Sequence, residues 1–333
     1  MITIISSIII FLLVILIHEF GHFIVAKRNG VNVLEFSVGM GPKIYERKKE
    51  ETLYTLRLFP IGGYCQLEGE DEENSSPRAL NNQTPWVRLK IILAGAMMNL
   101  LLAFVLLILL MSTVKSNTLV NSVVENSPAY SAGIKSGDKI VEINGSKVED
   151  SSQIINKVEE SDKVNLKVLR DGQELSFDLV SENTGSGKKI GVSFANDYDI
   201  KSFNLINGIK YGSKTFVNTI IMLYKFIGQL ITGNLDMSGV SGPVGVVKEI
   251  GNASKMGLAS LTFMLAYINL NLAVFNLLPI PALDGGRAVF ILIEQITGKR
   301  VSPEVEGYIH FAGLIFLLGL IIFVTYKDII KLI

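Results

Sequence analysis

The first apolar segment of the chain contains the sequence His18-Glu19-Phe20-Gly21-His22. In a helix, two histidines four residues apart project from the same face and can share a metal ion. A carboxylate at Glu19 then lies beside that ion and can take a proton from a water held there, which is the chemistry that the HExxH spacing provides in zinc hydrolases. The alternative is a chance HExxH match in an ordinary helix.

Histidine is scarce in this chain. Only three histidines are present, and two of them lie in this motif. Because ionisable groups are costly to hold in an apolar segment, their position there indicates a functional site. We therefore expect His18 and His22 to bind a metal ion, with a third ligand supplied from elsewhere in the chain.

The composition is that of a membrane protein. The 333 residues are 49% hydrophobic and only 19% charged, and their mean hydropathy is +0.41, which is too apolar for an ordinary soluble domain. The net charge is zero, so we expect no nucleic-acid partner. The single cysteine, Cys65, excludes an internal disulfide and a cysteine-rich zinc site.

Four stretches are long enough to cross a bilayer, which requires about 20 apolar residues. They are residues 2–26, 91–114, 258–283 and 307–326. A fifth stretch, 203–233, is interrupted by three lysines, and we interpret it as an interfacial helix. The predicted fold is a polytopic α-helical membrane protein with four transmembrane helices.

Basic residues orient these spans. Those that flank the connection between the first two spans are Lys27, Arg28, Arg88 and Lys90. Because such residues favour the cytoplasmic side, we expect this connection in the cytoplasm and the N-terminus outside. His18 and His22 then lie inside the bilayer near its cytoplasmic face.

The cytoplasmic connection is expected to form a small membrane-associated β-loop. Its β-rich runs, 33–38, 52–59 and 64–67, are separated by glycines. The sequence Pro60-Ile61-Gly62-Gly63-Tyr64 exposes backbone to which an extended partner could add as a strand. The alternative is a simple glycine-rich turn.

Residues 118–195 change in character. Short β-rich runs alternate with the turn dipeptides Asn144-Gly145 and Asp171-Gly172, which predicts an inserted β-rich domain. Residues 127–134 and 137–145 resemble a PDZ domain of the bacterial type, a fold that binds peptide ends by strand addition. The insert follows an even number of spans, so we expect it outside the cytoplasm.

The third span offers the missing ligand. It ends in the sequence NLLPIPALDGG at residues 276–286, in which Asp284 is the only acid between residues 250 and 293. Prolines break the helix there, and irregular backbone at membrane depth is tolerated only against protein or a cavity. Two histidines, one aspartate and an open position match a catalytic zinc site. The alternative for Asp284 is a helix-end residue at the membrane interface.

Topology supports this choice. If a single span lies between them, the first and third spans run in the same direction, so His18, His22 and Asp284 reach the same membrane face from the C-terminal ends of their spans. A fifth span at 203–233 would place Asp284 on the opposite face. We interpret His310 as a packing residue or a support for the ligands.

Six features together resemble the site-2 protease family of intramembrane zinc metalloproteases, specifically its bacterial PDZ-containing regulator-of-sigma type. They are HEFGH at 18–22, PIGGY at 60–64, AGAMMN at 94–99, the PDZ-like insert, SGPVG at 241–245 and NLLPIPALDGG at 276–286. The resemblance covers nearly the whole chain. One departure is Ala96, where the family usually has proline; the change is expected to alter the helix near Asn99 without affecting the ligands.

The resemblance implies roles for residues. It implies one Zn²⁺ per chain held by His18, His22 and Asp284, with Glu19 as general base. It also implies that the substrate is held as a strand by four residues, namely Gly62, Gly63, Asn271 and Asn276. The implied substrates are single-span membrane proteins already trimmed by a separate first-cutting protease, such as anti-sigma factors, or signal-peptide remnants.

The expected organisation has four parts. Residues 1–117 hold the first two spans and the β-loop, 118–195 the PDZ domain, 196–257 an interfacial segment and 258–333 the last two spans. In the bacterial cytoplasmic membrane, the active site would lie near the cytoplasmic face and the PDZ domain would lie outside the cytoplasm. The alternatives are a silent scaffold, which would not need Glu19, and a zinc transporter, which should show metal sites on more than one face.

Overall fold

The computed structural model describes residues 2–70, 74–149, 151–184, 187–198, 203–233 and 241–330. The chain forms two compact units. One unit comprises Met1–Leu110 and Asn207–Ile333, and the other comprises Met111–Ile206.

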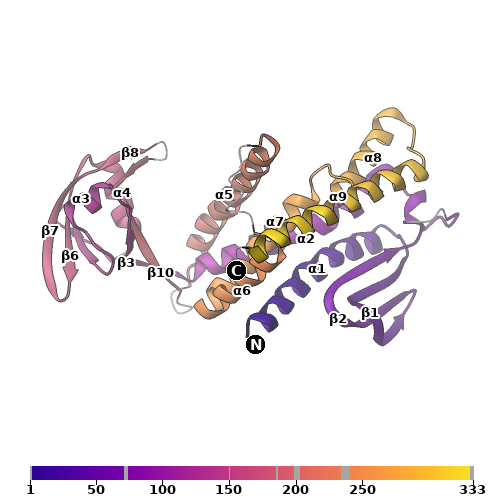
Figure 1. Cartoon of the computed structure of the whole chain (residues 1–333), viewed down its shortest axis with the longest axis horizontal. Helices are drawn as coiled ribbons and strands as arrows, with labels where there is room; N and C mark the ends of the chain where they lie inside the picture. Colours follow the sequence, from indigo (N-terminus) through magenta and orange to yellow (C-terminus); the bar gives the residue numbers. More distant parts are fainter. Residues whose placement is uncertain are drawn as a thin grey trace. The chain divides into compact units, whose positions relative to one another are not determined.

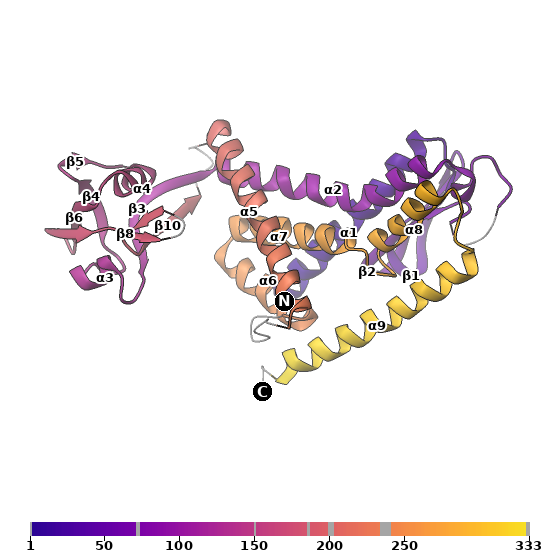
Figure 2. The same cartoon turned by 90° about the horizontal axis from the view of Figure 1, so that it is seen from above.

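Helices dominate the first unit (Figures 1 and 2). They are α1 (Ile2–Arg28), α2 (Pro85–Ser112), α5 (Leu205–Ile231), α6 (Pro243–Met256), α7 (Leu258–Asn276), α8 (Asp284–Thr297), α9 (Pro303–Ile330) and the short 3₁₀ helix η1 (Leu80–Asn82). Within the described chain, α1, α2, α7 and α9 are long and apolar enough to cross a membrane. Their positions agree with the four stretches expected from the sequence.

The third stretch differs from its predicted extent. We predicted a span over 258–283 with Asp284 near its C-terminal end, but α7 ends at Asn276 and Asp284 is the first residue of α8. Pro279 and Pro281 explain the difference, because proline lacks a backbone N–H and disfavours helical geometry in the residue before it. The aspartate therefore lies at a helix N-terminus, where a negative charge is favoured.

The buried face of α1 places the HExxH motif. From Ser7 to Gly21 its buried residues recur at intervals of three and four, as expected for one helix face: Ser7, Ile10, Val14, His18 and Gly21. The motif thus continues the stripe along which α1 packs in the protein, and its histidines face inward.

Helix α5 packs through one apolar face. Leu223 and Ile227 of α5 belong to a buried cluster that also contains Leu107 of α2 and Leu270 of α7. Its Gly212 lies so close to α2 that an added Cβ would approach the backbone of Ile108 to 2.8 Å. The position of α5 at a membrane surface stays a prediction.

The SGPVG motif forms the start of α6. The buried carboxylate of Asp328, near the end of α9, accepts hydrogen bonds from the backbone N–H groups of Gly242, at 3.0 Å, and Gly245, at 2.7 Å. A carboxylate at this position satisfies N–H groups that the helix leaves unpaired. The motif therefore links α6 to the end of α9.

Strands β1 (Val33–Lys49) and β2 (Thr52–Leu67) form the β-loop, and both are longer than the predicted runs. The two strands curl, because residues 35–38 pair with 63–66 on one side and with 53–56 on the other. Figure 1 shows this hairpin beside α1. Among the described residues, no strand pairs with the remaining edge of 63–67. We call 63–67 the edge segment.

The second unit is built on a six-stranded antiparallel sheet in the order β10-β3-β4-β6-β7, with β5 beside β4. Its elements are β3 (Val114–Val123), α3 (Pro128–Ala132), β4 (Lys139–Ile143), β5 (Ser146–Lys147), α4 (Ser151–Glu160), β6 (Lys163–Arg170), β7 (Gln173–Val180), β8 (Glu182–Thr184), β9 (Gly187–Lys189) and β10 (Val192–Tyr198). Both predicted turn dipeptides have positive φ at each residue: 46° and 76° at Asn144-Gly145, and 50° and 81° at Asp171-Gly172. These values are those of type I′ hairpin turns.

Candidate active site

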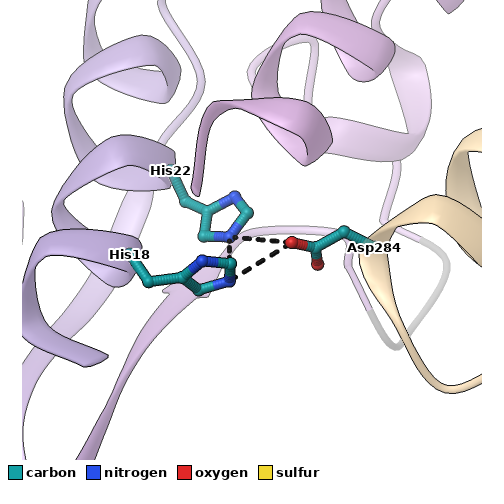
Figure 3. Close-up of side chains that lie close together, drawn as sticks. All are labelled: His18, His22 and Asp284. Atoms are coloured by element: carbon teal, nitrogen blue, oxygen red, sulfur yellow. Dashed lines mark hydrogen bonds and ion pairs between the residues drawn. The ribbon is translucent and has the colours of Figure 1, made fainter. Parts of the chain in front are cut away.

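Three side chains from two elements meet in the first unit (Figure 3). His18 and His22 project from α1, and Asp284 points toward them from the start of α8. The Nε2 atoms of the two histidines lie 3.2 Å apart. The Oδ2 atom of Asp284 lies 3.2 Å from Nε2 of His18 and 3.7 Å from Nε2 of His22.

This triangle has the dimensions of a zinc site. Tetrahedral zinc with bonds of about 2.0–2.2 Å holds its N and O ligand atoms about 3.3 Å apart. Oδ2 of Asp284 is buried and has no hydrogen-bond partner, although such an atom is normally satisfied. A cation between the three atoms would satisfy it, and two histidines with one carboxylate form a donor set typical of catalytic zinc. The residues fit the metal.

Contacts behind the histidines orient their rings. Nδ1 of His22 lies 2.8 Å from the carbonyl oxygen of Ile91, so Nδ1–H donates there and the Nε2 lone pair faces Asp284. Nδ1 of His18 lies 3.4 Å from the fully buried amide of Asn99. The atom of this amide that lies at that distance is Nδ2, and its Oδ1 has no hydrogen-bond partner. Asn99 thus contacts the candidate site.

Helix α2 approaches the site through glycines. A Cβ on Gly21 of α1 would overlap the backbone carbonyl of Ala94, and a Cβ on Gly95 would overlap the rings of His18 and His22. Small residues let two helices come this close. Residues 94–96, Ala-Gly-Ala, are small enough for this approach.

Glu19 is tied to the edge segment. Its carboxylate accepts a hydrogen bond from the backbone N–H of Cys65 at 3.0 Å. A Cβ added to Gly63 would lie 4.0 Å from Cγ of Glu19. The unpaired edge of the β-loop and the candidate base are therefore neighbours.

A cavity of about 510 Å³ opens onto these groups. Its lining includes the three clustered side chains, Glu19, residues 64–67 of the edge segment, and Glu70 with Arg287. Glu70 and Arg287 form an ion pair. This pair was not predicted from the sequence, although Arg287 follows Asp284 by three residues and so lies on the same side of α8.

The predicted substrate-binding residues are only partly brought together. Gly63 lies beside Glu19, but the residues that line the cavity include none of the four, Gly62, Gly63, Asn271 and Asn276. The amide of Asn271 donates to the carbonyl of Tyr267 in its own helix at 2.8 Å. Roles for these residues in holding substrate stay predictions.

Comparisons with known proteins agree with this chemistry. The model of Peptidase family M50 matches residues 6–320. A protein of Clostridium acetobutylicum named as a zinc metalloprotease is 39% identical, with 98% of this chain and 97% of that protein covered. The Regulator of sigma-W protease RasP of Bacillus subtilis is 29% identical, with 99% of each chain covered.

Solved structures align with a smaller part of the chain. The PDZ domain of the SdrC-like protein of Listeria innocua is 27% identical, with 23% of this chain and 92% of that chain covered, and the TM-score is 0.21. The family assignment depends on the full-length matches. Because one family model covers residues 6–320 and the relatives align end to end, the chain belongs to Peptidase family M50, the site-2 protease family, and is a zinc metalloprotease.

Proposed function

We propose that this protein cleaves the transmembrane segments of single-span proteins that another protease has already trimmed, such as anti-sigma factors, or signal-peptide remnants. The observation that carries this proposal is the position of the clustered triad. His18 and His22 lie in the middle and C-terminal part of α1, a helix apolar enough to span a membrane. The relative named as a regulator of sigma-W protease supports anti-sigma factors as substrates.

The edge segment is proposed to hold the substrate. A transmembrane helix hides its carbonyl groups in internal hydrogen bonds, so it must unwind before it can be cut. Residues 63–67 offer an edge with which no described strand pairs, and an unwound segment that adds there keeps its backbone hydrogen-bonded. Because Cys65 contacts Glu19, that pairing would bring a peptide bond beside the base.

The proposed roles divide the chemistry between the metal and Glu19. Bound by His18, His22 and Asp284, zinc would polarise the scissile carbonyl and acidify a water. Glu19 takes a proton from the attacking water and delivers it to the nitrogen as the C–N bond breaks, so the products are a carboxylic acid and an amine. The Cys65 N–H, 3.0 Å from Oε2 of Glu19, holds the carboxylate in place.

Cleavage of a defined substrate tests this function. The purified protein should cut a trimmed single-span anti-sigma factor inside its transmembrane segment, and a zinc chelator should stop the reaction. Mass spectrometry of the products locates the cut. Cleavage confined to the soluble parts of the substrate would contradict an intramembrane protease.

We further propose that the β-loop faces the cytoplasm and that the β-rich insert lies outside. A cysteine at Ser151 should then react with an impermeant thiol reagent added to intact cells, and a cysteine at Ser75 should react only after the cells are opened. A Cys65→Ser background removes the native thiol, which is buried, and burial raises its pKa. The opposite labelling pattern would reverse the proposed topology.

The insert is proposed to be a PDZ domain that excludes substrates with bulky extracytoplasmic domains. Each residue that lines the active-site cavity comes from the first unit, so the insert contributes no catalytic group among the described residues. The alternative is recruitment, in which its groove captures the C-terminus left by the first cut.

Deleting residues 120–194 with a short Gly/Ser bridge separates these two roles. With exclusion, trimmed substrate stays cleavable and full-length substrate becomes cleavable. Zinc content and a monodisperse elution profile report that the deletion protein is folded. If such a protein no longer cuts trimmed substrate, recruitment is the role of the insert.

A further inference from the structure

The non-helical connection that precedes Asp284 contains a strained residue. Ala282 has a φ of 74°, in the left-handed region that residues with a Cβ rarely adopt. Such a conformation persists when its surroundings hold it in place. Ala282 lies two residues before Asp284, so its conformation sets the direction in which the chain enters α8.

One side chain from another helix holds Ala282. Nδ1 of His310, on α9, accepts a hydrogen bond from the backbone N–H of Ala282 at 2.8 Å. An accepting Nδ1 requires the neutral ring with its proton on Nε2. That Nε2 is buried and has no hydrogen-bond partner, and the carboxylate of Glu306 lies 3.8 Å away. The ring is therefore directed at Ala282.

Helix α9 contacts the same connection one turn further along. A Cβ on Gly313 would approach the backbone carbonyl oxygen of Pro281 to 2.6 Å. Along most of its length α9 packs little: of its described residues, Gly313 and Asp328 are the buried ones. Contact with residues 281–282 is thus one of the two places where α9 is closely fixed.

We infer that His310 is a positioning residue for the metal site. By accepting from the N–H of Ala282, it keeps the connection in the conformation that carries Oδ2 of Asp284 to within 3.2 Å of His18 and 3.7 Å of His22. This inference rests on the proposed role of Asp284 as a zinc ligand. His310 itself is not among the residues that line the active-site cavity.

Three variants of the full-length protein test the inference. His310→Ala removes the acceptor, and we expect zinc to bind about 10-fold to 100-fold more weakly, the usual effect of losing a group that orients a ligand. His310→Asn supplies an amide oxygen near the position of Nδ1, and we expect affinity close to wild type. Adding Ala282→Gly to His310→Ala should recover part of the affinity, because glycine adopts positive φ without strain.

The readouts are zinc affinity, from competition with a chromogenic chelator, and the visible absorption spectrum of the cobalt-substituted protein, which reports the ligand geometry. We expect an altered cobalt spectrum for His310→Ala and a wild-type spectrum for His310→Asn. Wild-type affinity and spectrum in His310→Ala would overturn the inference. So would equal losses in folded His310→Ala and His310→Asn proteins, because the role would then be packing.

Asp284→Ala separates this inference from the function on which it rests. If Asp284→Ala keeps its zinc, the ligand assignment fails whatever the His310 variants show. If Asp284→Ala loses zinc while His310→Ala retains wild-type affinity, the ligand assignment stands and the positioning role of His310 fails.

Discussion

Replacing Glu19 with glutamine should reduce cleavage of a trimmed substrate by about 10²-fold to 10⁴-fold, the usual contribution of a general base. The amide has the size of the carboxylate and can still accept the hydrogen bond that Cys65 donates, so the local structure should persist. It cannot take a proton from water. Turnover of a fluorescent transmembrane substrate measures the loss.

Metal content distinguishes this base from the ligands. The Glu19→Gln protein should retain about one zinc per chain, because its side chain is outside the triad. His22→Ala and Asp284→Ala should lose both activity and much of the zinc. Mass spectrometry of the metal in purified protein measures this difference. Wild-type turnover by Glu19→Gln would remove Glu19 from the mechanism.

Adding one methyl group at Gly95 should be as damaging as removing a ligand. The Cβ of Gly95→Ala would overlap Nε2 of His22 and the ring of His18. These rings cannot move away without leaving the triangle they form with Asp284. Displacements of about 1 Å at a catalytic site can cost 10²-fold in rate. We therefore expect at least a roughly 10²-fold loss of activity, with reduced zinc content.

A matched control is available in another apolar helix. Gly319 of α9 has no atom within 4 Å of the position that a Cβ would take, so Gly319→Ala should retain activity and zinc. Both variants replace glycine with alanine inside a helix, where alanine has the higher helix propensity. Full activity in Gly95→Ala would show that α2 does not pack against the histidines as described.

Sequence reasoning found the reactive groups because their chemistry limits where they can occur. Ionisable residues are rare in apolar segments, so His18, His22 and Asp284 stood out without any knowledge of their distances. The turns at Asn144 and Asp171 were equally accessible, because a two-residue hairpin turn with positive φ favours these residue types before glycine.

The supporting contacts could not be predicted in the same way. The carbonyl of Ile91, the amide of Asn99 and the ring of His310 act through distances set by helix packing, and no local pattern encodes these. The prolines at 279 and 281 predicted a break in the third span. They did not show that a new helix begins at Asp284 and presents this carboxylate from its first turn.

The close packing of α1 against α2 also bears on how fast the metal can exchange. The close contacts of Gly21 with the backbone of Ala94 and of Gly95 with the rings of His18 and His22 leave no room on the α2 side of the triad. The cavity that contains the Glu70 and Arg287 ion pair opens onto the triad. An ion or a chelator must therefore arrive through this cavity. Two forms of the protein with equal zinc affinity can consequently differ in exchange rate, and the residues around the cavity govern how quickly a chelator inactivates the enzyme.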